Sequence, residues 1–148
     1  MQLMVINGPN LNKLGSRDPE QYGTGTYMEL LQMIEEKNTE KVSIRCFQSN
    51  SEGRIIDYIQ QAGEDYDGIV INPGAYSHYS YAIMDALADV DIPKVEVHIS
   101  DVLNREDFRS ILITARSCDR MISGHGFKGY LEAIDYLAEV LDEHQTTK

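Results

Sequence analysis

The chain is poor in cysteine and has no long apolar stretch, and each shortage excludes a class of protein. Its two cysteines, Cys46 and Cys118, are too few for a disulfide framework and too far apart in sequence for a zinc site. We expect both to be buried thiols of a cytoplasmic protein. The longest apolar runs, such as residues 68–71, are short, whereas a membrane-spanning helix needs about 20 apolar residues.

Positive charge is also scarce. The 13 lysines and arginines are outnumbered by 24 aspartates and glutamates, which gives a net charge of −11. Binding to nucleic acid phosphates or to an anionic membrane surface depends on basic residues, so we expect neither partner. Residues 1–6 carry no basic group and no small-residue cleavage site, and we therefore expect no signal peptide.

With 148 residues, 42% of them hydrophobic, the chain has the size and composition of one globular domain over residues 1–148. Short segments rich in β-branched residues predict strands at 2–7, 42–48, 68–72, 94–100 and 119–123. One helix is expected to begin after Thr26, and a second is expected to follow a capping box at 49–52 and to end near Gly63. Further helices are expected at 81–90, from near Asn104, and at 128–143, followed by a polar tail at 144–148.

Strands that alternate with helices imply a parallel sheet with helices on both faces. Five such units favour a flavodoxin-like, doubly wound α/β fold. In this class, ligands bind beyond the carboxyl ends of the strands. The segment after the first strand, about 10–25, is roughly three times longer than a usual connection, so we predict a lid. Gly23 and Gly25 are suited to a hinge, and the segment carries Asn10, Arg17 and Tyr22.

The fourth predicted strand carries the clearest pattern of candidate catalytic side chains. Glu96 and His98 lie two residues apart, so both side chains point to the same face. A carboxylate beside an imidazole orients the ring and favours its protonated form, which suits a general acid. A structural Glu–His pair in the core is the alternative interpretation. Beyond this pair, Ser100 and the amides of Ile99 and Ser100 are suited to hold an anion.

Further polar side chains follow the third and fourth strands. Asn72 ends the third strand, where its side chain would face the crevice. His78 is predicted to open a helix and to be neutral, because the positive end of the helix dipole disfavours imidazolium. Arg105 and Arg109 lie four residues apart on the predicted helix near 104. They suggest an anionic substrate, with surface pairing to acidic neighbours as the alternative.

The sequence contains no recognisable cofactor motif. The glycine-rich residues 123–129 follow neither a dinucleotide fingerprint nor a phosphate loop, and cysteines and histidines are too dispersed for a metal site. These features favour proton transfer without a cofactor. A phenol has a usual pKa of about 10, so its ionisation at pH 7 costs about 4 kcal/mol. One unit charge at about 4 Å supplies a similar amount, and we expect Arg17 to supply it to Tyr22 with help from Arg109.

Several motifs resemble the type II 3-dehydroquinate dehydratase family and together span nearly the whole chain. They are 6–11 (INGPNL), 14–15 (LG), 17–19 (RDP), 22–23 (YG), 71–78 (INPGAYSH), 85–87 (DAL), 96–100 (EVHIS), 105–109 (REDFR) and 129–130 (GY). The resemblance implies a flavodoxin-like fold and dehydration of 3-dehydroquinate to 3-dehydroshikimate without cofactor or metal. It also implies a cytoplasmic homododecamer built from trimers.

The resemblance also implies roles for individual residues. Tyr22 matches the base that removes the C2 proton, and Arg17 matches the lid arginine that favours tyrosinate. Asn10 matches the residue that holds a water against the enolate oxygen. His98 matches the acid, oriented by Glu96. The implied substrate contacts are Asn72 and the Ile99 and Ser100 amides for the carboxylate, His78 and Arg109 for the ring hydroxyls, and Asp85 from a neighbouring subunit.

Some positions depart from the family pattern. Lys13 stands in the lid where an apolar residue is usual, Asp101 where asparagine is common, and Leu103 where histidine is frequent. Around the last strand, Arg120 and His125 replace smaller or more apolar residues. None of these positions coincides with an implied catalytic residue, so they bear on trimer packing and lid mobility.

Three other kinds of protein share the expected fold class. A flavodoxin would need a short phosphate loop rich in Ser and Thr after the first strand. A phospho-accepting receiver domain would need acidic residues where the chain has Asn7 and Asn72. A plain small-molecule binding module differs from an enzyme only in lacking turnover.

Overall fold

The computed structural model describes residues 1–146, and the side chains of residues 1–144. Its centre is a sheet of five parallel strands in the order β2-β1-β3-β4-β5. The strands are β1 (Gln2–Asn7), β2 (Ser43–Gln48), β3 (Gly68–Asn72), β4 (Lys94–His98) and β5 (Arg120–Ser123). The strand order reverses direction at β1, so the crevice between the ends of β1 and β3 is the expected ligand site. The flavodoxin-like fold predicted from the sequence is confirmed.

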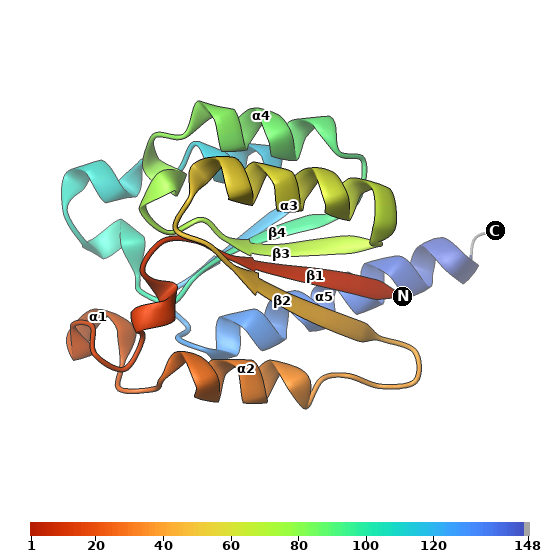
Figure 1. The fold of residues 1–148 in the computed structure, drawn as a ribbon, viewed down its shortest axis with the longest axis horizontal. Coiled ribbons are helices and arrows are strands. Elements are labelled where there is room, and N and C mark those ends of the chain that lie inside the picture. Colours follow the sequence, from red (N-terminus) through yellow and green to blue (C-terminus); the bar gives the residue numbers. More distant parts are fainter. Residues whose placement is uncertain (147–148) are drawn as a thin grey trace.

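Helices cover both faces of the sheet (Figure 1). α2 (Tyr27–Glu35) and α5 (Lys128–Thr146) pack on one face, and α3 (Glu52–Asp65) and α4 (Tyr81–Asp89) pack on the other. Alternate residues of β1 serve the two cores. Leu3 and Val5 join the α2–α5 core, whereas Met4 and Ile6 join the α3–α4 core. Burial on both faces explains why the strands read as continuous apolar runs.

Side-chain caps set the beginnings of the helices. Thr26 Oγ1 accepts a hydrogen bond from the Glu29 amide at 3.1 Å, which confirms the predicted start of α2. The predicted capping box of α3 began at Ser49, two residues too early. The observed cap is Ser51, whose Oγ accepts from the Arg54 amide at 3.3 Å, while Ser49 Oγ accepts from the Ser51 amide at 3.0 Å.

The predicted end of α3 at Gly63 is wrong, because the helix continues to Asp65. A Cβ atom at Gly63 would lie 2.6 Å from Cγ1 of Val90. The glycine therefore allows α3 to approach the end of α4 closely, and it does not terminate the helix. At the carboxyl end of the chain, α5 extends to Thr146, so residues 144–146 of the predicted polar tail are helical, and residues 147–148 lie outside the described part.

The segment between β4 and β5 differs most from the prediction. The structure has no helix near Asn104, but three short 3-10 turns, η3 (Val102–Asn104), η4 (Asp107–Ser110) and η5 (Thr114–Ser117). The strands on either side are shorter than predicted, since β4 ends at His98 and β5 begins at Arg120. The break between η3 and η4 takes Arg105 and Arg109 off the common helix face predicted for them.

The long segment after β1 is ordered locally. It contains η1 (Leu11–Lys13) and the short helix α1 (Pro19–Tyr22). Leu11 and Leu14 are buried in the α2–α5 core, so the root of the predicted lid is anchored by packing. Gly23, at the end of α1, has a φ of +72°, a conformation that favours glycine. Among the described helices, none has the length and apolar character needed to cross a bilayer.

Candidate active site

A cavity of about 120 Å³ lies at the carboxyl ends of β1, β3 and β4. Of the residues predicted for the site, those that line it are Asn10, Arg17, Tyr22, Asn72, His78, His98, Ile99, Ser100 and Arg109. Glu96 lies behind His98, fully buried. Asp85 is exposed on α4 and does not line this cavity. The structure therefore gathers residues from between Asn10 and Arg109 at the predicted edge of the sheet.

Two glycine-containing motifs form the floor of the cavity. The Gly8 amide donates to the Asn72 carbonyl at 2.8 Å, and a Cβ atom at Gly8 would lie 2.6 Å from the Pro73 carbonyl oxygen. Gly74 has a φ of +61°, and a Cβ there would lie 3.1 Å from the Pro9 carbonyl oxygen. The loops after β1 and β3 can pack this closely only because both contact points lack a side chain.

Asn50 has a role that sequence reasoning missed. It lies within the capping box predicted at 49–52, but its Oδ1 accepts from the Asn10 amide at 3.0 Å and from Gln48 Nε2 at 3.1 Å. Its carbonyl accepts from the Tyr76 hydroxyl at 2.9 Å. Asn10 itself has a φ of +71°, which asparagine tolerates better than most residues. Asn50 thus fixes the backbone of Asn10 at the cavity wall.

The oxygen of Tyr22 lies between two arginines. Arg17 Nη2 donates to it at 2.9 Å and Arg105 Nη1 donates at 2.8 Å. The Arg17 guanidinium carbon also lies 3.8 Å from the centre of the Tyr22 ring. Arg105 is fixed further by a contact of 3.2 Å with Ser100 Oγ. The phenolic oxygen therefore accepts two charge-assisted hydrogen bonds, which are stronger than hydrogen bonds between neutral groups.

Arg105 was noticed in the sequence but was not assigned to Tyr22. The prediction that Arg109 would help Arg17 to ionise Tyr22 is wrong, since Arg109 Nε forms an ion pair with Glu106 Oε2 at 2.7 Å. Both arginines nevertheless line the cavity. The i, i+4 spacing could not distinguish them, because no helix forms there and the turns decide which guanidinium reaches the lid.

His98 and Glu96 form the pair expected from their alternation on β4. His98 Nε2 lies 2.7 Å from Glu96 Oε2, and the two side chains are 5% and 0% exposed. The carboxylate can only accept, so Nε2 carries the hydrogen in this contact. The carboxylate therefore fixes the orientation of the imidazole ring at the cavity wall. This arrangement can hold a proton at the cavity wall and release it.

His78 is held by the backbone of the neighbouring turns. Its Nδ1 lies 2.9 Å from the Ile111 carbonyl oxygen, and its ring packs edge-on against Phe108 with centres 5.9 Å apart. Burial lowers the pKa of His78, and the nearby His98 and Arg109 lower it further. The predicted neutral form is therefore supported, but the predicted cause is wrong. His78 ends a 3-10 turn, η2 (Gly74–His78), and does not open a helix.

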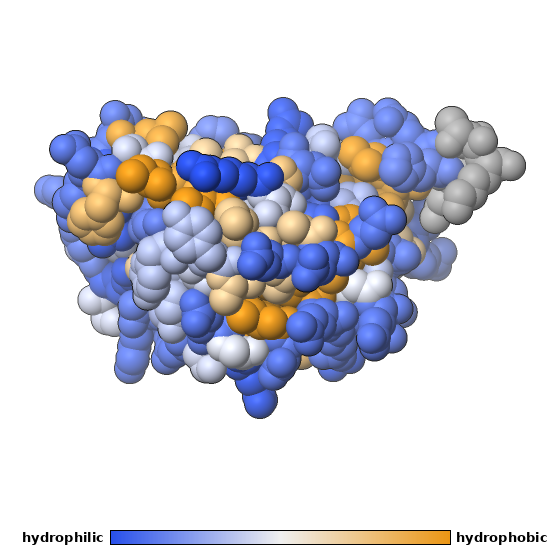
Figure 2. Space-filling view, turned by 90° about the horizontal axis from the view of Figure 1, so that it is seen from above, coloured by the Kyte–Doolittle hydropathy of each residue, from blue (hydrophilic) through white to orange (hydrophobic). Residues whose placement is uncertain are grey.

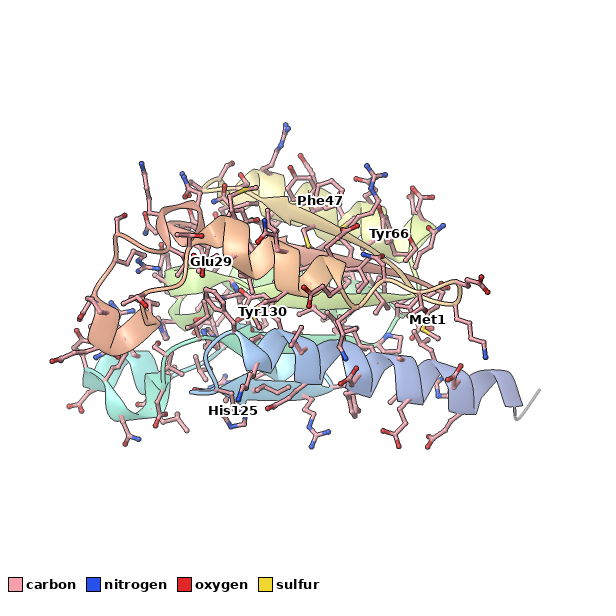
Figure 3. All side chains as sticks on the ribbon, turned by 90° about the horizontal axis from the view of Figure 1, so that it is seen from below. Met1, Glu29, Phe47, Tyr66, His125 and Tyr130 are labelled. Atoms are coloured by element: carbon pink, nitrogen blue, oxygen red, sulfur yellow. The ribbon has the colours of Figure 1, made fainter. Side chains whose placement is uncertain are left out.

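A buried hydrogen-bond chain fixes the amide of Asn72 from behind. Its Nδ2 donates to the Tyr130 hydroxyl at 2.9 Å, and that hydroxyl donates to Asn7 Oδ1 at 2.7 Å. Asn72 Oδ1 accepts from the Gly74 amide at 3.1 Å. Tyr130 lies near the start of α5, on the face of the sheet that α2 and α5 cover (Figure 3). Burial raises the pKa of its hydroxyl, so the hydroxyl stays protonated. The family motif at 129–130 supplies this hydroxyl, which accepts from Asn72 and donates to Asn7.

Tyr22 also borders a second, open cavity of about 530 Å³, which shares Ile99 and Ser100 with the first. Its lining includes the acidic side chains of Glu20, Glu29 and Asp101. The inner cavity instead has three arginines in its lining and no aspartate or glutamate. An anionic molecule is therefore favoured in the inner cavity.

The positions that depart from the family pattern lie outside the inner cavity. Lys13 and Leu103 are exposed. His125 Nδ1 pairs with Glu132 at 2.8 Å, and the Arg120 guanidinium stacks on an aromatic ring of α5. In residues 1–146, no group of three or more His, Cys, Asp or Glu side chains is arranged to hold a metal ion.

An arginine-flanked tyrosine and a buried Glu–His pair at the carboxyl edge of a flavodoxin-like sheet define an enzyme of the acid–base class. Residues 1–138 match the family described as dehydroquinase class II, and the chain belongs to this family. The resemblance seen in the motifs is thereby confirmed.

Individual relatives agree along almost the full length. The chain is 53% identical over 144 residues to the 3-dehydroquinate dehydratase of Thermotoga neapolitana, covering 97% of this chain and 98% of that one. It is 56% identical over 137 residues to the 3-dehydroquinate dehydratase of Lachnoclostridium phytofermentans, covering 91% and 94%. The crystal structure of a type II dehydroquinase from Butyrivibrio crossotus superposes with a TM-score of 0.91 at 55% identity, covering 93% and 97%.

Proposed function

We propose that this chain dehydrates 3-dehydroquinate to 3-dehydroshikimate by an anti elimination, with the phenolate of Tyr22 as base and His98 as acid. The observation that carries the proposal is the contact of two guanidinium groups with the Tyr22 oxygen, at 2.9 and 2.8 Å. A tyrosine without a chemical role has no use for two partly buried guanidinium groups on its oxygen. A base that must be ionised at neutral pH requires them.

The base step removes the proton at C2, next to the ketone at C3. Tyr22 takes this proton, and the electron pair moves into an enolate whose charge rests on the former carbonyl oxygen. Asn10, whose backbone Asn50 fixes, holds a water against this oxygen. As the proton is transferred, the negative charge that Arg17 and Arg105 stabilise leaves the Tyr22 oxygen. A negative charge develops on the enolate oxygen within the same cavity.

The acid step expels the hydroxyl group at C1. The imidazolium of His98 gives its proton to this hydroxyl, the C1–O bond breaks, and water leaves as the C1–C2 double bond forms. Glu96, at 2.7 Å, stabilises the charged ring before the transfer and orients it throughout. All steps are proton transfers, so we propose that the reaction needs neither cofactor nor metal.

The substrate carries a carboxylate, and we propose that it binds at Asn72 and at the amides of Ile99 and Ser100. The three arginines of the cavity lining provide a favourable field for this anion. Neutral His78 is suited to hydrogen bonding with a ring hydroxyl, since burial keeps it uncharged, and Arg109 is placed for a second such contact.

The direct test mixes the purified protein with 3-dehydroquinate and follows the ultraviolet absorbance of the conjugated enone, in the presence and absence of EDTA. We expect turnover at the same rate in both samples. Absence of enone at saturating substrate would overturn the proposed function. Loss of activity in EDTA alone would overturn only the proposal that no metal takes part.

The Tyr130→Phe variant tests the proposed carboxylate site. Without the hydroxyl, Asn72 loses the acceptor that fixes its amide, and we expect KM to rise about tenfold, the effect of one hydrogen bond, with kcat little changed. Steady-state kinetics on 3-dehydroquinate measure both constants. Tyr136→Phe, on the same helix, is the control and should leave both unchanged. A fall in kcat at constant KM would contradict the role of Tyr130 in binding.

The remaining proposals concern the whole molecule. We propose one catalytic domain over residues 1–148 that acts in the cytoplasm as a homododecamer of trimers, with Asp85 reaching the cavity of a neighbouring subunit. Asp85 is exposed on α4, as this role requires. The α3–α4 side of the molecule carries apolar areas between charged ones (Figure 2). The large hydrophobic side chains that are exposed in the described part of the chain are Met28, Tyr79, Tyr81, Leu103, Phe108 and Ile111.

A further inference from the structure

The carboxylate of Glu96 has a second partner, on the side away from His98. Its Oε1 accepts a hydrogen bond of 2.5 Å from Thr114 Oγ1, while Oε2 contacts His98 Nε2 at 2.7 Å. Thr114 begins η5 and is 0% exposed, as is Glu96. Within residues 1–146 these are the two hydrogen-bond partners of this carboxylate. Thr114, Glu96 and His98 therefore form one hydrogen-bonded line that ends at the cavity.

The direction of these hydrogen bonds follows from the groups themselves. An ionised carboxylate only accepts, so the threonine hydroxyl donates to one oxygen and the imidazole donates to the other. A buried carboxylate oxygen without a donor is destabilised in its charged form. Behind the pair, Cys118 adds no second negative charge, since burial raises the pKa of its thiol. On the cavity side, His78 is neutral because burial lowers its pKa, and Arg109 is the charged neighbour.

We propose that Thr114 is a positioning residue for the acid step, orienting the Glu96 carboxylate so that Oε2 fixes the Nε2–H of His98 and leaves Nδ1 to deliver the proton. This inference rests on the proposed function. In the step itself the proton passes from Nδ1 to the C1 hydroxyl as the C1–O bond breaks. Water leaves, and the ring remains neutral with its Nε2–H on Glu96. Thr114 touches no reacting atom and acts only through the carboxylate.

Nothing in the local sequence of Thr114 indicates this role. The residue lies 18 positions after Glu96, beyond the two 3-10 turns η3 and η4, which the sequence pattern does not indicate. Its backbone also takes part in packing, because the carbonyl lies 3.8 Å from Cys118 Sγ. A test must therefore separate the hydroxyl from the rest of the residue, and the acid step from the base step.

The Thr114→Val variant removes the hydroxyl and keeps the shape of the side chain. We expect the dehydration rate to fall about 10- to 100-fold, the effect of one hydrogen bond to a charged group. Exchange of the C2 proton with deuterated solvent needs only the base step, so we expect its rate to stay near that of wild type. The ratio of exchange in recovered substrate to dehydration should rise by the same factor.

Two further variants serve as controls. Thr114→Ser keeps the donor and should restore dehydration, and Cys118→Ala alters the neighbouring packing without touching the hydroxyl and should leave both rates unchanged. Circular dichroism reports whether each variant folds. If Thr114→Val does not fold, Thr114→Ala and Thr114→Ser, which differ only in the hydroxyl, make the same comparison.

Three results would overturn the assignment. They are a wild-type dehydration rate in a variant without the hydroxyl, an equal loss of exchange and dehydration, and failure of serine to restore what alanine or valine loses. Each of these is read against active wild-type enzyme, so it leaves the proposed function intact. Wild-type protein that forms no enone would overturn the proposed function, and this assignment with it.

Discussion

Replacing Tyr22 with phenylalanine is expected to lower kcat by about 10⁴-fold, the upper end of what a general base contributes, while the affinity for substrate stays close to that of wild type. The variant keeps the ring that Arg17 covers at 3.8 Å and loses only the oxygen on which the two arginines converge. Binding depends on other residues of the cavity, and proton abstraction depends on this oxygen.

The measurement combines enone formation with substrate binding by calorimetry. Tyr58 provides a matched control, because it also accepts a hydrogen bond from an arginine, Arg54 Nε at 3.4 Å, but on the surface of α3. Tyr58→Phe should leave kcat and KM unchanged. If Tyr22→Phe kept more than about a tenth of the wild-type kcat, the phenolate could not be the base, since a tenfold effect is only about 1.4 kcal/mol.

The parts of the site that the sequence predicted are those determined by local periodicity. Glu96 and His98 meet because side chains two apart on a strand share a face. The long segment after β1, for which a lid is predicted, stands out because its length exceeds that of an ordinary connection. The strand pattern likewise predicted the parallel sheet. In each case the physical rule acts over a few residues, so one sequence is enough to apply it.

The parts that could not be predicted depend on contacts between distant segments. Arg105 reaches Tyr22 across 83 positions, and Asn50 reaches Asn10 across 40. The predicted helix near 104 failed for the same reason. An i, i+4 pair of arginines is compatible with a helix, but the carboxyl edge of the sheet holds this segment as short turns, and their path decides that Arg105 turns toward the lid.

The second large effect is expected from the arginines that flank Tyr22. Ionising a phenol at pH 7 costs about 4 kcal/mol, and two guanidinium groups at 2.9 and 2.8 Å share that task. We expect Arg17→Ala and Arg105→Ala each to lower kcat by at least about 10²-fold, which corresponds to about 3 kcal/mol. Arg54→Ala, at the surface tyrosine, is the control and should have no effect on kcat.

A double-mutant cycle decides whether Arg105 works through the phenolate or only shapes the cavity. If it works through the oxygen of Tyr22, then Arg105→Ala should slow the wild-type enzyme strongly but should hardly slow a Tyr22→Phe enzyme, since the effects of two substitutions that act on one atom are not additive.

Should the residual rate of Tyr22→Phe be too low to measure, the tyrosinate absorbance band gives the same information, because Arg105→Ala should remove this band at neutral pH as completely as Tyr22→Phe does. A band that persists without Arg105 would leave Arg17 as the group that holds the charge, and Arg105 would then be a ligand of the substrate.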